Sequence, residues 1–144
     1  KGATINTPSM LCVEDALDAL AWVESIGGLS SSIKRSENNL KAVKHWVKNS
    51  HWIDFLCEDY DNLSSTSICL KIKDKSFLNL SDDMQKSKII EINTILEKEN
   101  VAYDINSYRT APPGFRIWGG STVETSDIVS LLPWLDWAYT IVNG

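Results

Sequence analysis

The feature that most constrains the fold is a regular alternation of apolar and polar residues in the segment 67–73. In the run Ser67-Ile-Cys-Leu-Lys-Ile-Lys73, the residues Ile68, Leu70 and Ile72 fall on one face of an extended strand. Such a strand has one face that must be covered by other elements. The chain is therefore expected to build a half-buried sheet and to pack other elements against its apolar face.

Four segments have the periodicity of amphipathic helices. The first is expected from about Val13 to Ile26 and is closed by Gly27-Gly28, and the second from about Ile33 to Lys48 after a Ser30-Ser-Ser32 cap. The third is expected over about Asp82–Glu99 with Ser81 as its cap. The last follows a capping-box pattern at Ser121–Glu124 and reaches about Val142, with Pro133 expected to kink or divide it. In the first helix, Val13, Leu17, Leu20 and Val23 form an apolar stripe. The residues expected to point inward in the next two helices are Ile33, Leu40, Val43 and Val47, and then Ile89, Ile92, Ile95 and Leu96.

Three further strands are expected at Trp52–Leu56, Val101–Ile105 and Phe115–Trp118. The resulting order, ααββαββα, predicts a single α+β domain with a small, mostly antiparallel sheet of about four strands and helices packed on one face. The other face of that sheet, together with residues 1–12, is expected to expose apolar surface that needs a partner.

Composition excludes several classes of function. A net charge of -5 argues against nucleic-acid binding, and Lys41, Lys44 and Lys48 have the spacing of one solvated helix face. No apolar run approaches the ~20 residues of a membrane span. The cysteines form no CxxC and match no zinc spacing with the histidines, so we expect no metal site and reduced thiols in a cytoplasmic protein.

Arg116 is the strongest candidate for a binding residue. It lies at the start of an expected strand, after the turn formed by Pro112, Pro113 and Gly114. A guanidinium held at a strand end can bind a carboxylate through two parallel hydrogen bonds. The alternative is a half-exposed arginine paired with a nearby acidic residue.

A second candidate is the uncharged run Asn6-Thr7-Pro8-Ser9, whose amide, hydroxyl and backbone N–H groups can hold a phosphate without a charge. The alternative is a simple turn that leads into a helix. The sequence contains no G-x-S-x-G, no H-E-x-x-H and no phosphate-binding glycine loop. Cys69 lacks a partner base in the sequence, so no complete catalytic set is present.

Several blocks spread from end to end resemble the C-terminal part of the phosphoserine aminotransferase family, in the form typical of alphaproteobacteria and some archaea. That family belongs to the class V, fold-type I, pyridoxal-phosphate aminotransferases. The matching blocks are Gly2-Ala-Thr-Ile-Asn-Thr-Pro-Ser-Met-Leu-Cys-Val-Glu-Asp15, Trp22 with Ser25-Ile-Gly-Gly28, Val101-Ala-Tyr-Asp-Ile105, Ala111-Pro-Pro-Gly-Phe-Arg-Ile-Trp118 and Leu132-Pro-Trp-Leu-Asp-Trp137.

The resemblance implies amino-group exchange between L-glutamate and 3-phosphohydroxypyruvate, which yields O-phospho-L-serine in serine biosynthesis, by a cytoplasmic homodimer. Asn6 and Thr7 match the pair that binds the phosphate of pyridoxal 5'-phosphate in the neighbouring subunit's active site. Arg116 matches the arginine that binds the substrate's α-carboxylate. Arg109 is implied to lie near the substrate's phosphate. However, Tyr108 stands where the better-known bacterial form has His, and the loop to Arg116 is longer, so the roles of Tyr108 and Arg109 stay open.

The resemblance also implies a division of the chain. Residues 1–12 would be the end of the cofactor-binding segment, and residues 13–144 the C-terminal small domain. The Schiff-base lysine would lie upstream of Lys1, so the chain alone is expected to be inactive and to contain no catalytic residue. Two other interpretations remain: a non-catalytic binding or dimerisation module of the same fold, and another class V transaminase, of the serine–glyoxylate or alanine–glyoxylate type.

Overall fold

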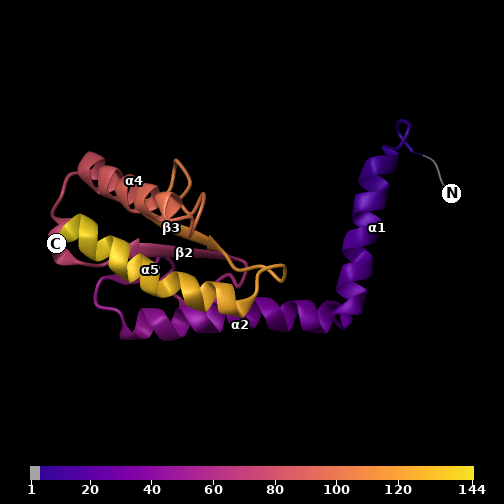
Figure 1. Ribbon diagram of the computed structural model, residues 1–144, viewed down its shortest axis with the longest axis horizontal. Helices are drawn as coiled ribbons and strands as arrows, with labels where there is room; N and C mark the ends of the chain where they lie inside the picture. Colours follow the sequence, from indigo (N-terminus) through magenta and orange to yellow (C-terminus); the bar gives the residue numbers. More distant parts are fainter. Residues whose placement is uncertain (1–3) are drawn as a thin grey trace. The chain divides into compact units, whose positions relative to one another are not determined.

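The computed structural model describes residues 4–144, which form five longer or shorter α-helices, one 3-10 turn and three strands (Figure 1). The chain consists of two compact units, residues 1–34 and residues 35–144, and the boundary between them falls inside the helix α2 (Gly28–Asn49). The elements, in chain order, are α1 (Met10–Ser25), α2 (Gly28–Asn49), β1 (Ile53–Phe55), the 3-10 turn η1 (Tyr60–Asn62), β2 (Ser67–Ile72), α3 (Lys75–Leu78), α4 (Asp82–Lys98), β3 (Gly114–Trp118) and α5 (Thr125–Asn143).

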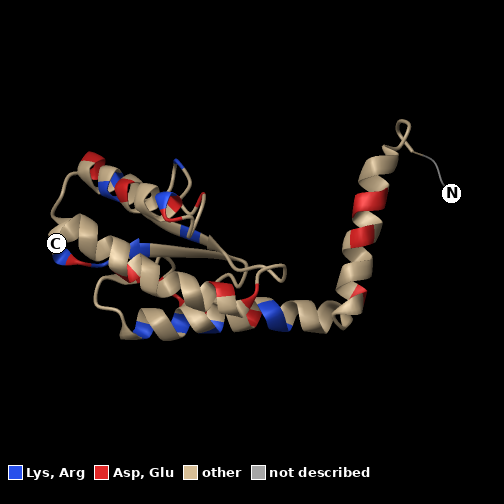
Figure 2. Cartoon of the chain, in the orientation of Figure 1, with Lys and Arg blue, Asp and Glu red and all other residues tan. Residues whose placement is uncertain are grey.

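The first unit consists mainly of α1. This helix begins at Met10, earlier than the expected Val13, because the Ser9 side chain accepts a hydrogen bond from the backbone N–H of Cys12. Gly27 and Gly28 end it with positive φ values of 105° and 74°, as their sequence predicted. α1 carries acidic side chains and no basic one (Figure 2).

No side chain of α1 is buried, so its apolar stripe is left uncovered by the described residues. Leu17 and Leu20 are 54% and 62% exposed. The periodicity correctly identified a helix, but periodicity cannot say which surface the helix covers.

The second unit contains an antiparallel sheet in the order β1-β2-β3. The sheet has three strands and not about four, because the strand expected at Val101–Ile105 does not form. Asp104 has a positive φ of 51°, which strand geometry does not allow, and only an isolated bridge between Asn106 and Phe115 remains beside β3. The segment after α4 is therefore a loop that lies along β3 without extending the sheet.

One face of the sheet joins α2, α4 and α5 in a single hydrophobic core, as the α+β prediction required. The buried strand residues are Ile53, Phe55, Ile68, Leu70, Ile72, Phe115 and Ile117, and the helices contribute Leu40, Val43, Val47, Ile89, Ile92, Leu96, Ile128, Leu132, Leu135, Ala138 and Tyr139. The alternation predicted for β2 is confirmed by its burial pattern. Leu40, Val43, Val47, Ile89, Ile92 and Leu96 are buried as expected.

The other face of the sheet is polar, so the expectation of an exposed apolar face is wrong. Asp54, Cys69, Lys71 and Arg116 are half-buried on this face, where Asp54 lies opposite Lys71 and Cys69 lies opposite Arg116. We call this the polar face. It ends at Trp118, which is 54% exposed.

Several helix boundaries differ from their sequence signals. The Ser30-Ser-Ser32 run lies inside α2 and does not cap it, and Ile33 is exposed. Glu124 is the N-cap of α5 and makes no side-chain capping bond, because its carboxylate pairs with Arg35. The capping box at Ser121 is therefore wrong, and Pro133 does not divide α5.

The sequence did not predict the short helix α3. The Asp74 side chain caps it by accepting a hydrogen bond from the backbone N–H of Ser76.

Candidate functional site

Arg116 lies in the middle of β3, and its side chain projects from the polar face. Its neighbours in sequence, Phe115 and Ile117, point into the core because strand side chains alternate. The backbone N–H of Arg116 donates to the carbonyl oxygen of Ile105 at 2.8 Å, which fixes this part of the strand against the preceding loop. The sheet thus holds the guanidinium on a rigid element.

The guanidinium of Arg116 has two weak contacts. Its Nη2 lies 3.8 Å from Oδ2 of Asp104, and its Cζ lies 4.6 Å from the centroid of the Tyr108 ring. The Arg116 side chain is 21% exposed, whereas that of Asp104 is 90% exposed, so solvent screens the ion pair. The alternative interpretation, an arginine paired with a nearby acidic residue, thus corresponds only to this long contact between Arg116 and Asp104.

The Nε atom of Arg116 is buried and has no hydrogen-bond partner among the described residues. A buried donor without a partner costs free energy that an incoming acceptor recovers. A carboxylate is the acceptor that matches the planar guanidinium, because it accepts two parallel hydrogen bonds. The geometry therefore fits a carboxylate-binding arginine.

The loop before β3 carries Tyr108 and Arg109 and is held to α4 by a hydrogen bond between a buried and a half-buried asparagine. Asn93 of α4 is 4% exposed, and its Nδ2 donates to the backbone oxygen of Ile89 at 2.8 Å and to Oδ1 of Asn106. The β-bridge between Asn106 and Phe115 adds a second attachment. The sequence analysis did not identify Asn93 or Asn106 as site residues, because their spacing in the sequence does not predict a contact between them.

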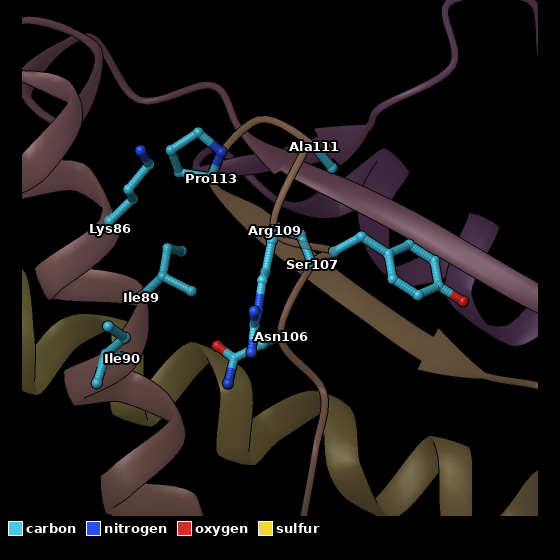
Figure 3. Close-up of a pocket in the computed structure, with 9 residues that line it drawn as sticks. Lys86, Ile89, Ile90, Asn106, Ser107, Arg109, Ala111 and Pro113 are labelled. Atoms are coloured by element: carbon cyan, nitrogen blue, oxygen red, sulfur yellow. The ribbon is translucent and has the colours of Figure 1, made fainter.

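A cavity of about 260 Å³ opens between α4 and this loop (Figure 3). Lys86, Ile89 and Ile90 line it from α4, and Asn106, Arg109 and Pro113 are among the loop residues that line the other side. The fold brings the predicted Arg109 to this cavity and places Tyr108 both in its lining and against Arg116. Tyr108 therefore connects Arg116 to the cavity that Arg109 lines.

Asn6 and Thr7 belong to the first unit and precede the N-terminus of α1. The backbone N–H of Thr7 donates to Oδ1 of Asn6 at 2.8 Å, which leaves the Asn6 amide nitrogen and the Thr7 hydroxyl as exposed donors. No charged residue occurs between Thr4 and Val13. These neutral donors beside a helix N-terminus fit a phosphate group.

A second polar cluster connects α2, β1 and α5 away from the polar face. Asp136 accepts hydrogen bonds from the indole nitrogens of Trp46 at 2.9 Å and Trp52 at 2.7 Å. Trp52 stacks on Tyr139 with ring centroids 4.0 Å apart, and the Tyr139 hydroxyl donates to Asp74 at 2.7 Å. The pKa of Asp74 is lowered, mainly by this hydrogen bond. The pKa of Tyr139 is raised, mainly by burial and to a smaller extent by the same hydrogen bond.

Other kinds of site are missing from the part of the chain that the structure describes. Residues 4–144 contain no group of three or more His, Cys, Asp or Glu side chains that could hold a metal ion. Within the same residues no helix is long and apolar enough to cross a membrane. Cys12, Cys57 and Cys69 are free thiols.

Comparison with known proteins gives consistent results. The chain is 47% identical to phosphoserine aminotransferase of Methanosarcina barkeri (strain Fusaro / DSM 804) over 143 residues. This alignment covers 99% of this chain and 36% of that relative. The enzyme of the same name from Methanosarcina mazei is 46% identical with the same coverage. No protein-family model matches the sequence.

Solved structures show the same fold. Phosphoserine aminotransferase from Bacillus circulans subsp. alkalophilus superposes with a TM-score of 0.76 at 16% identity, over 94% of this chain and 34% of that structure. A phosphoserine aminotransferase structure that records radiation damage of the Schiff base has a TM-score of 0.75 at 13% identity, over 94% of this chain and 35% of that structure.

Along 99% of its length the chain is similar to part of an aminotransferase, and both of these curated relatives carry the name phosphoserine aminotransferase. The chain spans 36% of the length of these relatives.

Proposed function

We propose that this chain is the substrate-recognition part of a pyridoxal-phosphate-dependent phosphoserine aminotransferase. In this proposal the parent enzyme transfers the amino group of L-glutamate to the keto carbon of 3-phosphohydroxypyruvate and forms O-phospho-L-serine. Residues 13–144 are its C-terminal small domain, and residues 1–12 end the cofactor-binding segment. The support is the 47% identity to a curated relative over nearly the whole chain.

The observation that carries the proposal is the geometry of Arg116. Its guanidinium lies on the polar face with a buried Nε that lacks a partner, and the cation-lined cavity follows directly beyond Tyr108. Glutamate and 3-phosphohydroxypyruvate each have a carboxylate next to the reacting carbon. A fixed arginine that binds this carboxylate would orient the reacting carbon, which converts binding energy into rate.

Asn6 and Thr7 are proposed to hold the phosphate of pyridoxal 5'-phosphate through the amide nitrogen and the hydroxyl, in the active site of the other subunit of a homodimer. When bound, the cofactor supplies the electron sink that makes the proton on the substrate's α-carbon labile. This chain's own contribution is to bind and orient the substrate's anionic groups and to cover the site against water. The enzyme is proposed to act in the cytoplasm, as the family resemblance implies.

The first test is a transaminase assay on the native gene product that contains this chain, supplied with pyridoxal phosphate, glutamate and 3-phosphohydroxypyruvate. Formation of phosphoserine in that protein, with none from the 144-residue chain, is the expected result. Activity only with glyoxylate as amino acceptor would replace the proposal by a serine–glyoxylate or alanine–glyoxylate type of transaminase. No activity with any of these acceptors would leave a non-catalytic module of this fold.

A further inference from the structure

The cavity between α4 and the loop 106–113 has an unusual balance of charge. Its lining contains two cationic side chains, Lys86 and Arg109, and no acidic one. Asp82 and Asp83 lie one turn earlier on α4 but do not line the cavity, and within residues 4–144 neither cation has an ion-pair partner. Two uncompensated positive charges beside one concave surface favour an anionic occupant.

The lining also presents a hydrogen-bond donor whose direction is fixed by the core. The buried Asn93 donates to Oδ1 of Asn106, so the acceptor end of the Asn106 amide is occupied. The opposite end of the same amide, the Nδ2 group, remains as a donor in a residue that lines the cavity. Asn93 therefore sets the amide of Asn106 in the orientation that suits an anion.

The remaining lining is apolar and limits the size of the occupant. Ile89, Ile90 and Pro113 contribute to it, and the cavity volume is about 260 Å³ (Figure 3). Tyr108 connects this space to Arg116, because it lines the cavity while its ring lies against the Arg116 guanidinium. The carboxylate-binding candidate Arg116 and the cavity thus share Tyr108 as a common neighbour.

We propose that Lys86 and the Asn106 amide, together with Arg109, bind the phosphate of the substrate, so that α4 contributes directly to selection of a phosphorylated oxo acid. This inference rests on the proposed function and adds Lys86 and Asn106 to its site. Phosphate has three terminal oxygens, and an ammonium, a guanidinium and an amide provide donors from two sides of the cavity. Asn93 acts through Asn106 and is a positioning residue.

The test compares Lys86→Met, which keeps most of the length of the side chain and removes its charge, with the unmodified native gene product loaded with pyridoxal phosphate. Binding of inorganic phosphate is measured by titration calorimetry, and KM is measured separately for 3-phosphohydroxypyruvate and for glutamate. We expect phosphate binding to weaken about tenfold and KM for the phosphorylated substrate to rise by a similar factor, as for loss of one hydrogen bond to a charged group. KM for glutamate, which has no phosphate, should stay unchanged.

Two control variants sharpen the result. Lys98→Met removes an exposed lysine from the other end of α4, outside the cavity, and should change none of these quantities. Lys86→Arg keeps the positive charge and should retain most of the phosphate affinity. Circular dichroism of each variant checks that α4 is intact.

The outcomes separate this inference from the proposed function. Phosphate binding that is lost in Lys86→Met, in a protein that does not transaminate 3-phosphohydroxypyruvate, would support the phosphate site and reject the proposed reaction. An active enzyme in which Lys86→Met changes neither phosphate affinity nor KM by more than about twofold would overturn the role of Lys86. An equal rise in KM for glutamate, or no phosphate binding by the unmodified protein, would also overturn it.

Discussion

Adjacent residues of β3 belong to two different parts of the molecule. Phe115 is fully buried among the helices, whereas Arg116, the next residue, projects from the polar face with a partly exposed guanidinium. The same strand therefore contributes to the core through one face and, in the proposed function, to substrate recognition through the other. Changes on the two faces should have separable consequences, because the side chains share only the backbone.

The polar face should be the part whose change most affects activity. In the native enzyme, Arg116→Ala is expected to lose roughly 3–5 kcal/mol of transition-state stabilisation, because it removes one partner of a largely desolvated charge pair. Steady-state kcat/KM gives this value, and the urea midpoint should change little. Near-normal kcat/KM would remove Arg116 from the site.

The core face should respond in the opposite way. Phe115→Ala is expected to lower the free energy of unfolding by about 3–4 kcal/mol, because Phe115 is fully buried and truncation leaves a cavity. Urea denaturation followed by circular dichroism measures this loss. Phe115→Leu is the matched control and should cost less, because it refills most of the volume. A large loss of kcat/KM in protein that remains fully folded would contradict the separation of the two faces.

The cluster around Asp136 tests whether partly buried polar groups behave like the apolar core. Asp136→Ala leaves the indole N–H groups of Trp46 and Trp52 without their acceptor, so the free energy of unfolding should fall by about 2–3 kcal/mol. Asp136→Asn keeps one acceptor oxygen and should lose less. Equal stability of the two variants would show that these hydrogen bonds contribute little.

The smallest expected effect depends on pH. The hydrogen bond from Tyr139 lowers the pKa of Asp74 in the folded state, so its stabilisation is present above the unfolded pKa of about 4 and disappears as the pH falls through the folded pKa. Tyr139→Phe should therefore cost about 1 kcal/mol or less at pH 7, since solvent screens this carboxylate, and still less near pH 2. Urea unfolding at the two pH values checks this. A cost that grows toward low pH would reverse the assigned sign.

Local patterns predicted those elements whose formation depends on neighbouring residues. The alternation of Ile68, Leu70 and Ile72, the Ser81 cap of α4 and the Gly27-Gly28 end of α1 are all found as expected. The expected strand at Val101–Ile105 failed because the positive φ of Asp104 turns the chain away from the sheet. The capping box at Ser121 failed because Glu124 pairs with Arg35, which is far away in the sequence.

The candidate site shows the same division. Arg116, Arg109, Asn6 and Thr7 were found from residue type and from the family resemblance, and their binding roles stay predictions. Lys86 and Asn106 carried no signal, since a lysine on a helix surface and an asparagine in a loop have many ordinary uses.

By itself the sequence determined the positions of the four longer helices and of the three strands that form, the alternation that separates the two faces of β2, and the similarity to phosphoserine aminotransferases. Tertiary structure alone decided that the second face is polar and that the loop 106–113 packs against α4. It also decided that Asn93 orients Asn106 and that Tyr108 links Arg116 to the cavity. The physical reason is range: periodicity and capping depend on residues a few positions apart, whereas these contacts depend on how the chain closes upon itself.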